Sequence, residues 1–159
     1  RINGTEATDE ALIGAFARID QARAQTSLTY FEFGTLAAFL IFAERHLDIA
    51  LLEVGLGGRL DAVNIVDPTV SVISSVDIDH VEWLGSDREF IGYEKAGIMR
   101  HGGVTVYAES NPPRSVREYA QKVGAILSVN GSDYSYRDLG NGTWHWQCGE
   151  QLDAGKSRS

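Results

Sequence analysis

Glu53 and the glycines that follow it have the composition of a ligand-binding loop. The carboxylate stands at the end of the apolar run 48–54, and the stretch 55–58 contains three glycines, followed by Arg59 and Asp61. Glycines let the backbone approach a ligand closely and expose its amides. The alternative interpretation is a tight turn from a strand into a loop, and the glycines alone do not decide between the two.

A second cluster, Asp77, Asp79 and His80, follows the apolar run 70–76. Carboxylate ligands with few nitrogens suit Mg²⁺, usually together with the phosphates of ATP. A lone histidine is more often structural, but Glu53 at the end of another run strengthens the metal interpretation. We predict that Glu53 and His80 lie at the ends of adjacent or near-adjacent parallel strands and face one cleft.

Two lysine-containing motifs need separate interpretations. Lys95 lies in the stretch 94–98, and a lysine beside a glutamate on a helix is usually part of a solvated face. Gly155-Lys156-Ser157 resembles the end of a Walker A loop, but Gly149 leaves five intervening residues where that motif has four. The sequence therefore contains no phosphate-binding loop of this type.

Helices and strands must position these residues. The spacing of the apolar residues switches along the chain between the values typical of helices and those typical of strands. Short apolar runs bounded by turns are typical of buried parallel strands, and they alternate here with helical patterns. This order predicts an α/β fold, a doubly wound and mostly parallel sheet with ligands at the carboxyl ends of its strands. The expected helices cover residues 9–19, 30–45, 86–99 and 112–123, and the expected strands cover 48–54, 70–76, 104–108 and 125–129. In the helix over 86–99, we expect Phe90, Ile91, Ala96 and Ile98 to be core residues.

The C-terminal part has a different pattern. Tyr134 and Tyr136 alternate with polar residues, as do Trp144 and Trp146, and a turn separates the two pairs. This predicts a two-stranded antiparallel hairpin. The polar stretch 153–159 is expected to be a disordered tail.

Composition limits the classes of function. The chain has 159 residues and a formal net charge of −8, which argues against broad nucleic-acid binding. No apolar run approaches the length of a membrane span, so no membrane contact is expected. Cys148 is the only cysteine, which favours a reducing, cytoplasmic location.

Four motifs in one order resemble the folylpolyglutamate synthase signature. They are Leu28-Thr29-Tyr30-Phe31-Glu32, the stretch from Glu53 to Asn64 (EVGLGGRLDAVN), Asp79-His80 with Trp83-Leu84-Gly85, and Glu94-Lys95-Ala96-Gly97-Ile98. The chain is identified by this resemblance as a member of the bifunctional dihydrofolate synthase and folylpolyglutamate synthase family, within the Mur ligase superfamily. The stretch from Glu53 to Asn64 is the most specific of the four.

The resemblance implies a monomeric parent enzyme that joins L-glutamate to dihydropteroate or to a folate. ATP would phosphorylate the pterin-bearing carboxylate, the glutamate amine would attack the acyl phosphate, and Mg²⁺ would reduce the charge repulsion. Glu53 and His80 match metal ligands of the family, and Lys95 matches a lysine carried as a carbamate, which reverses its interpretation as a solvated residue. The pterin-site segments match Thr29, Tyr30, Phe31, Glu32, Leu60, Asp61 and Ala62.

The resemblance also implies parts that this sequence does not contain. Residues 1–152 match part of a central ATP-binding domain, and the family's phosphate-binding loop is expected before Arg1. The family's C-terminal domain, which carries much of the glutamate site, is expected to be absent from these 159 residues. We therefore expect the 159-residue chain alone to be inactive. The alternatives are part of a Mur-type cell-wall amino-acid ligase, or a catalytically dead module that binds folate or a partner.

Overall fold

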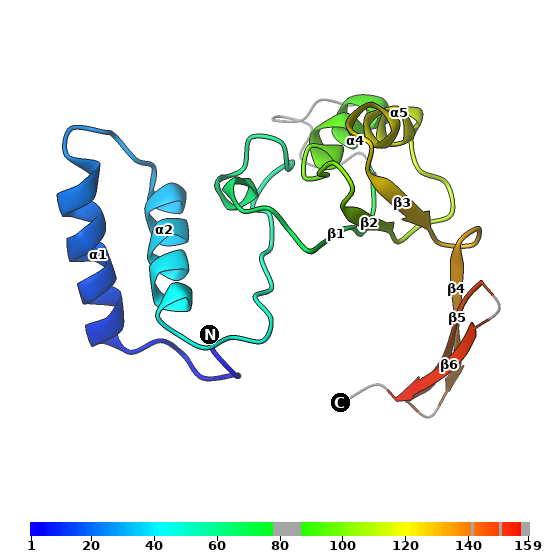
Figure 1. The fold of residues 1–159 in the computed structure, drawn as a ribbon, viewed down its shortest axis with the longest axis horizontal. Coiled ribbons are helices and arrows are strands. Elements are labelled where there is room, and N and C mark those ends of the chain that lie inside the picture. Colours follow the sequence, from blue (N-terminus) through cyan, green and yellow to red (C-terminus); the bar gives the residue numbers. More distant parts are fainter. Residues whose placement is uncertain (78–86, 141, 150, 157–159) are drawn as a thin grey trace. The chain divides into compact units, whose positions relative to one another are not determined.

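The computed structural model describes residues 1–77, 87–140, 142–149 and 151–156 (Figure 1). The contacts divide the chain into two compact units, Arg1–Val54 and Gly55–Ser159. The boundary lies within the motif that begins at Glu53, so the two parts of that motif belong to different units.

The first unit is a pair of helices, α1 (Asp9–Arg23) and α2 (Tyr30–Ala43). The expected cap of α1 is confirmed, because the Thr8 side chain accepts a hydrogen bond from the Ala11 amide at 3.3 Å. The helices pack through small and branched residues, and their core consists of Ala15, Ile19, Ala37 and Ile41.

The segment 48–54, predicted as a strand, is not one in this structure. Its apolar side chains are largely exposed, 84% for Ile49 and 81% for Leu51. No strand of the described residues pairs with this segment. An apolar run forms a buried strand only when a neighbouring strand supplies hydrogen-bond partners, and this condition is not met here.

The second unit contains the predicted parallel sheet. Strands β1 (Val70–Ile73), β2 (Val104–Tyr107) and β3 (Ile126–Val129) lie in the order β1-β2-β3, and both pairings are parallel. Helices α4 (Arg88–Ala96) and α5 (Arg114–Val123) cover one face (Figure 1). The α/β class is confirmed. The core contains Ile73, Val76, Ile91, Ala96, Met99, Tyr107, Val116, Ala120 and Val129.

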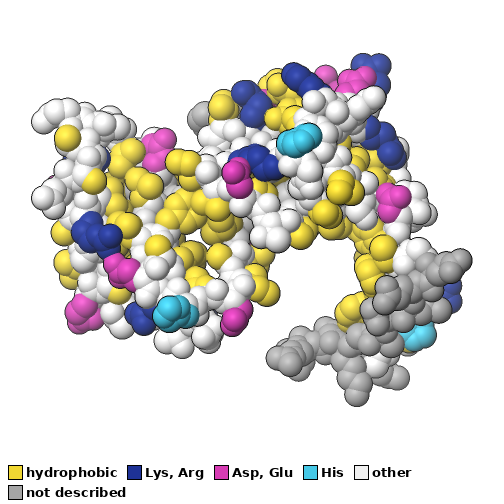
Figure 2. Space-filling view, viewed as in Figure 1, with side chains coloured by type: hydrophobic (Ala, Val, Ile, Leu, Met, Phe, Trp, Pro, Cys, Tyr) yellow, Lys and Arg dark blue, Asp and Glu magenta, His cyan; other side chains and the backbone are white. Residues whose placement is uncertain are grey.

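The other face of this sheet stays open in the described residues. Val70, Val72 and Ile126 alternate with the core positions and are each more than half exposed. Hydrophobic side chains are visible on the surface in Figure 2. A doubly wound sheet carries helices on both faces, and the described part of the second unit supplies helices for one face only.

Helix α4 is shorter than the predicted 86–99, and its core was predicted only in part. Ile91 and Ala96 are buried and Ile98 packs against the core, but Phe90 is 48% exposed, so its assignment to the core was wrong. Phe90 precedes Ile91 by one position and is therefore rotated by about 100° from the buried face.

Within the described residues, no helix is both long and apolar enough to cross a membrane.

The C-terminal part is an antiparallel sheet of β4 (Tyr134–Gly140), β5 (Thr143–Cys148) and β6 (Gln151–Lys156). The predicted hairpin is confirmed as β4 and β5. The disordered tail expected from Asp153 is wrong for residues 153–156, which belong to β6. The free edge of β5 offers backbone groups that a polar segment can pair with, whatever its side chains.

Candidate functional site

The glycine-rich loop, residues 55–64, is organised by one carboxylate. Asp61 Oδ2 accepts hydrogen bonds from the amides of Gly55 at 2.9 Å and Leu56 at 3.1 Å. Its Oδ1 accepts from the Val63 amide at 2.9 Å and caps the short 3₁₀ helix η1 (Ala62–Ile65). Asp61, a predicted pterin-site residue, therefore fixes the shape of the loop through both of its oxygens.

Arg59 joins this loop to α4. Its backbone amide donates to the Glu94 carbonyl at 2.9 Å, and its Nε donates to the Glu94 carboxylate at 3.0 Å. Glu94 is buried, and the Arg59 guanidinium also lies 5.7 Å from the centre of the Tyr93 ring. A buried carboxylate requires such a partner, so the loop and the helix are coupled at this point.

Two glycines allow the loop and the helix to approach this closely. A Cβ on Gly58 would lie 2.8 Å from the Glu94 carbonyl oxygen, and one on Gly97 would lie 2.3 Å from the Arg59 Cβ. Both distances are shorter than non-bonded atoms tolerate. Gly58 and Gly97 therefore serve loop-to-helix packing, a role different from both the ligand contact and the tight turn considered from the sequence.

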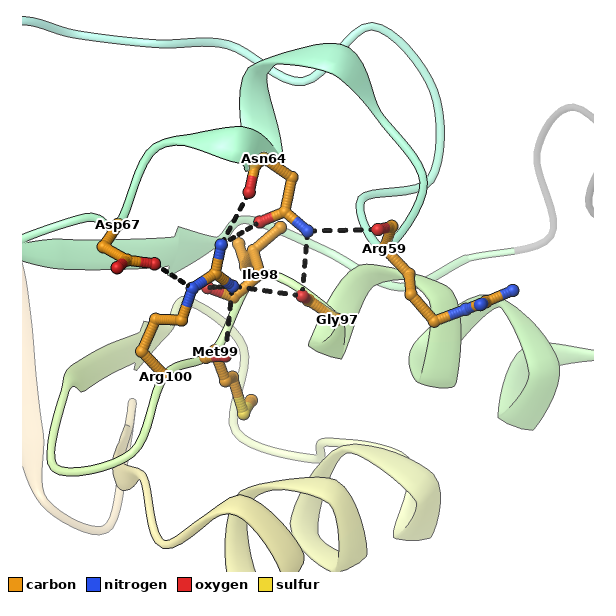
Figure 3. Close-up of polar contacts among 7 residues, drawn as sticks. All are labelled: Arg59, Asn64, Asp67, Gly97, Ile98, Met99 and Arg100. Atoms are coloured by element: carbon orange, nitrogen blue, oxygen red, sulfur yellow. Dashed lines mark hydrogen bonds and ion pairs between the residues drawn. The ribbon is translucent and has the colours of Figure 1, made fainter.

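Arg100 and Asn64 complete the attachment (Figure 3). The Asn64 Nδ2 donates to the carbonyls of Arg59 at 3.1 Å and Gly97 at 3.0 Å. Arg100 Nη2 donates to the Asn64 backbone oxygen at 2.6 Å, and its Nε pairs with Asp67. Its Nη1 faces the carbonyls at the end of α4, where a cation is favourable.

The sequence did not single out Arg100. It lies after the stretch 94–98 and belongs to no periodic pattern. A basic residue just past a helix end is the only signal that could have indicated it. Asn64 was part of the recognised motif, but its partners in α4 could not be read from spacing.

Lys95 lies next to this junction. It is half-buried on α4, between buried Glu94 and buried Ala96. Within the described residues its amine takes part in no ion pair or hydrogen bond. Lys95 is therefore not fully solvated, and its amine is not engaged in a polar structural contact within the described residues.

The segment 29–32 begins helix α2 with a capping box. The Glu32 amide donates to Thr29 Oγ1 at 3.2 Å, and the Glu32 carboxylate accepts from the Thr29 amide at 2.7 Å and its hydroxyl at 2.8 Å. The hydrogen bond from the Thr29 amide, followed by that from its hydroxyl, lowers the pKa of Glu32. Thr29 and Glu32 are therefore engaged with each other.

The apolar members of the pterin-site prediction are the ones that remain accessible. Tyr30 is 96% exposed, Phe31 45% and Leu60 79%, whereas Ala62 is half-buried in η1. The polar residues Thr29, Glu32 and Asp61 hold the backbone from which these side chains project. The first segment belongs to the first unit and the second to the other unit.

The predicted metal ligands are described only in part. Glu53 is exposed in the first unit, and its carboxylate makes no hydrogen bond or ion pair within the described residues. His80 lies outside the described residues, as does Asp79. Among the residues that the structure covers, no three acidic, histidine or cysteine side chains group closely enough to hold a metal.

These features define the class of the protein as a Mur-ligase-like α/β domain. The features that define it are a parallel sheet with helices on one face, and a glycine-rich loop attached to the helix that carries Lys95. No family model matches the sequence. Individual relatives do match it.

Two curated relatives are bifunctional enzymes. The dihydrofolate synthase/folylpolyglutamate synthase of Escherichia coli K12 is 48% identical over 136 residues, which is 86% of this chain and 32% of that protein. The protein of the same name from Haemophilus influenzae is 44% identical over 147 residues, or 92% of this chain and 33% of the relative. The chain thus spans about a third of the length of the curated relatives it matches.

Solved structures of such proteins share the fold. The Escherichia coli protein in complex with DHPP and ADP superimposes with a TM-score of 0.90 at 43% identity, covering 96% of this chain and 36% of the other. The Yersinia pestis protein complexed with AMPPNP and a Mn ion gives 0.89 at 47% identity, covering 96% and 37%. The chain is therefore homologous, over most of its length, to the bifunctional dihydrofolate synthase/folylpolyglutamate synthases.

Proposed function

We propose that this chain forms part of an enzyme that ligates L-glutamate to dihydropteroate or a folate at the expense of ATP. The observation that carries this proposal is the attachment of the glycine-rich loop to α4 by Arg59, Asn64 and Arg100. It brings together, in one unit, a predicted pterin-site segment and the lysine expected to serve the metal site. Relatives that match most of this chain bear the name dihydrofolate synthase/folylpolyglutamate synthase.

The exposed side chains Tyr30, Phe31 and Leu60 would contact the pterin. A flat ring is bound well by aromatic and aliphatic surfaces, which gain from its burial. Thr29, Glu32 and Asp61 would position these side chains through the backbone, since their own polar groups are satisfied locally. Exposed apolar groups on rigid supports suit ligand binding better than they suit stability.

The metal site would combine Glu53, His80 and a carbamate on Lys95. The free Glu53 carboxylate and the uncommitted Lys95 amine fit this use, because a ligand must not be engaged elsewhere. Related structures contain a Mn ion and an ATP analogue, and we propose Mg²⁺ as the ion here. When bound, the metal would screen charge repulsion between a carboxylate and the phosphates of ATP.

The carbamate would form when the neutral Lys95 amine attacks CO₂. A new N–C bond forms, one amine proton is released to solvent, and the side chain changes from a potential cation to an anion. Lys95 is half-buried, and the neighbouring Glu94 is already paired to Arg59. The amine therefore has no competing counter-ion in the described residues.

A cytoplasmic location of the protein fits its single cysteine, Cys148.

The decisive experiment is a ligation assay on the complete protein that carries this chain. Dihydropteroate, L-glutamate and MgATP should give phosphate and a glutamylated product in equal amounts. Phosphate release that depends on a cell-wall precursor in place of the pterin would refute the folate assignment. The 159-residue chain by itself should release no phosphate, and ATP- and glutamate-dependent release by it would contradict the proposal that other segments complete the site.

A further inference from the structure

The antiparallel sheet carries an aromatic pocket whose lining contains no residue of the glycine-rich loop or helix α4. Cross-strand pairing places Tyr136 opposite Trp146, and Asp138 opposite Trp144, so these four side chains share one face of β4 and β5. The hollow between them has a volume of about 520 Å³. It is lined by Tyr136, Asp138, Gly142, Thr143, Trp144 and Trp146.

The two faces of this sheet differ in character. The pairs on the opposite face are Arg137 with His145, and Ser135 with Gln147. One face is therefore polar and the other aromatic, although Tyr136 is 63% exposed and both tryptophans are only half-buried. Large aromatic side chains that are left accessible on one face are a common mark of a binding surface.

Charge complementarity indicates the occupant. Asp138 is exposed, its Oδ1 accepts a hydrogen bond from the Gly140 amide at 2.8 Å, and it forms no ion pair within the described residues. The chain as a whole has a net charge of −8. A cation is therefore the missing complement of this face.

We infer that the aromatic pocket binds an arginine side chain presented by a protein segment. Tryptophan is the best aromatic partner for a cation, and the planar guanidinium stacks on rings while it pairs with a carboxylate. The hollow is open at the surface and larger than one side chain requires, so it can admit the backbone on either side of the arginine. The lining shares no residue with the proposed ligation site, and the test of this inference uses neither ATP nor pterin.

Tryptophan fluorescence of the 159-residue chain reports binding directly. The sequence has three tryptophans, so a Trp83→Phe background leaves only Trp144 and Trp146. The probe is the blocked peptide acetyl-Gly-Arg-Gly-amide, and the matched control peptide carries citrulline, an uncharged isostere, in place of arginine. We expect a saturable signal with the arginine peptide and binding at least about tenfold weaker with citrulline.

Two variants test the pocket without disturbing the sheet. Asp138→Asn removes the charge but keeps an oxygen that can accept from the Gly140 amide, and Tyr136→Thr removes one exposed ring. Each should weaken binding several-fold, while His145→Ala on the opposite face should not, and circular dichroism should show a folded sheet in all three. Equal binding of arginine and citrulline peptides, an equal response to a lysine peptide, or no saturable signal would overturn the inference.

Discussion

Arg59 and Glu94 are joined twice, through the Arg59 amide to the Glu94 carbonyl at 2.9 Å and through the Arg59 Nε to the Glu94 carboxylate at 3.0 Å. The side chain of Glu94 is only 10% exposed, whereas that of Arg59 is 38% exposed. The carboxylate is thus held in a poorly solvated place by one guanidinium and by the shape of the loop. Several consequences of this arrangement can be measured.

Replacing Arg59 by Met should destabilise the second unit by about 1–3 kcal/mol, because Glu94 would keep its burial and lose its cation. Urea unfolding of Arg59→Met, Glu94→Gln and the double variant gives the coupling energy between the two residues. The control is Arg18→Met, which breaks the exposed pair of Arg18 and Glu44 and should cost less than about 1 kcal/mol. Additive effects of Arg59→Met and Glu94→Gln would contradict the coupling.

Gly97→Ala should also be destabilising, because the new Cβ would overlap Arg59 at 2.3 Å. The backbone at this point would have to move, which we expect to cost more than about 1 kcal/mol. Gly14→Ala and Gly34→Ala are matched controls within α1 and α2, where a new Cβ meets no atom within 4 Å. They should instead stabilise by about 0.5–1 kcal/mol. Thermal unfolding should show a lower melting temperature for Gly97→Ala and a higher one for each of the two controls. A stabilised Gly97→Ala would disprove the close contact.

Tyr107 should make stability sensitive to alkaline pH. Burial, and then the charge of Glu109, raise the pKa of Tyr107 from 10.0 to about 12. The unfolded chain therefore loses this proton first, so the contribution is complete below about pH 10 and is lost as the pH rises to about 12. Urea unfolding of wild type and Tyr107→Phe across this range should show a steeper decline for wild type. Parallel declines would contradict the expectation.

Lys95→Ala should lower turnover of the complete protein far more than it lowers stability. The loss of one half-buried lysine should change folding by no more than about 0.5 kcal/mol, whereas each 1.36 kcal/mol of lost transition-state stabilisation reduces the rate about tenfold. Ligation kinetics and thermal unfolding should be measured together. The control is Lys122→Ala, an exposed lysine in the last turn of α5, which should change neither.

A carbamate on Lys95 predicts further behaviour of these two proteins. Added bicarbonate should raise the activity of wild type and leave Lys95→Ala unchanged. A short carboxylic acid in solution should partly restore the variant, because it can take the place of the missing anionic group. A folded Lys95→Ala protein with full activity would return this lysine to the surface of the helix and remove it from the metal site.

The elements that local signals specify were predictable from the sequence. Thr8 caps α1, Thr29 caps α2, and Gly124 ends α5 with a positive φ of 71°. Each of these residues acts on backbone groups within a few positions, so its effect is written in the nearby sequence. The parallel strands were also recognised, although each is shorter than its apolar run.

Features that depend on distant partners were not predictable in the same way. The run 48–54 has the composition of a strand but lacks a paired neighbour in the described residues, and β6 forms from polar residues because β5 offers an edge. The contacts of Arg100 join residues more than thirty positions apart. Sequence spacing predicted which motifs carry the candidate site, but it could not show which of their polar groups are already engaged.

The attachments of the glycine-rich loop all run forward along the chain, from Arg59 and Asn64 to α4 and Arg100. The amides of Gly55 and Leu56 are bonded within the loop, to Asp61. Local opening of the loop should therefore be coupled to unfolding of α4. Hydrogen exchange should then show the amides of Gly55 and Leu56 protected to the same degree as those of α4, so a loop in an enzyme's binding site would have the lifetime of a helix.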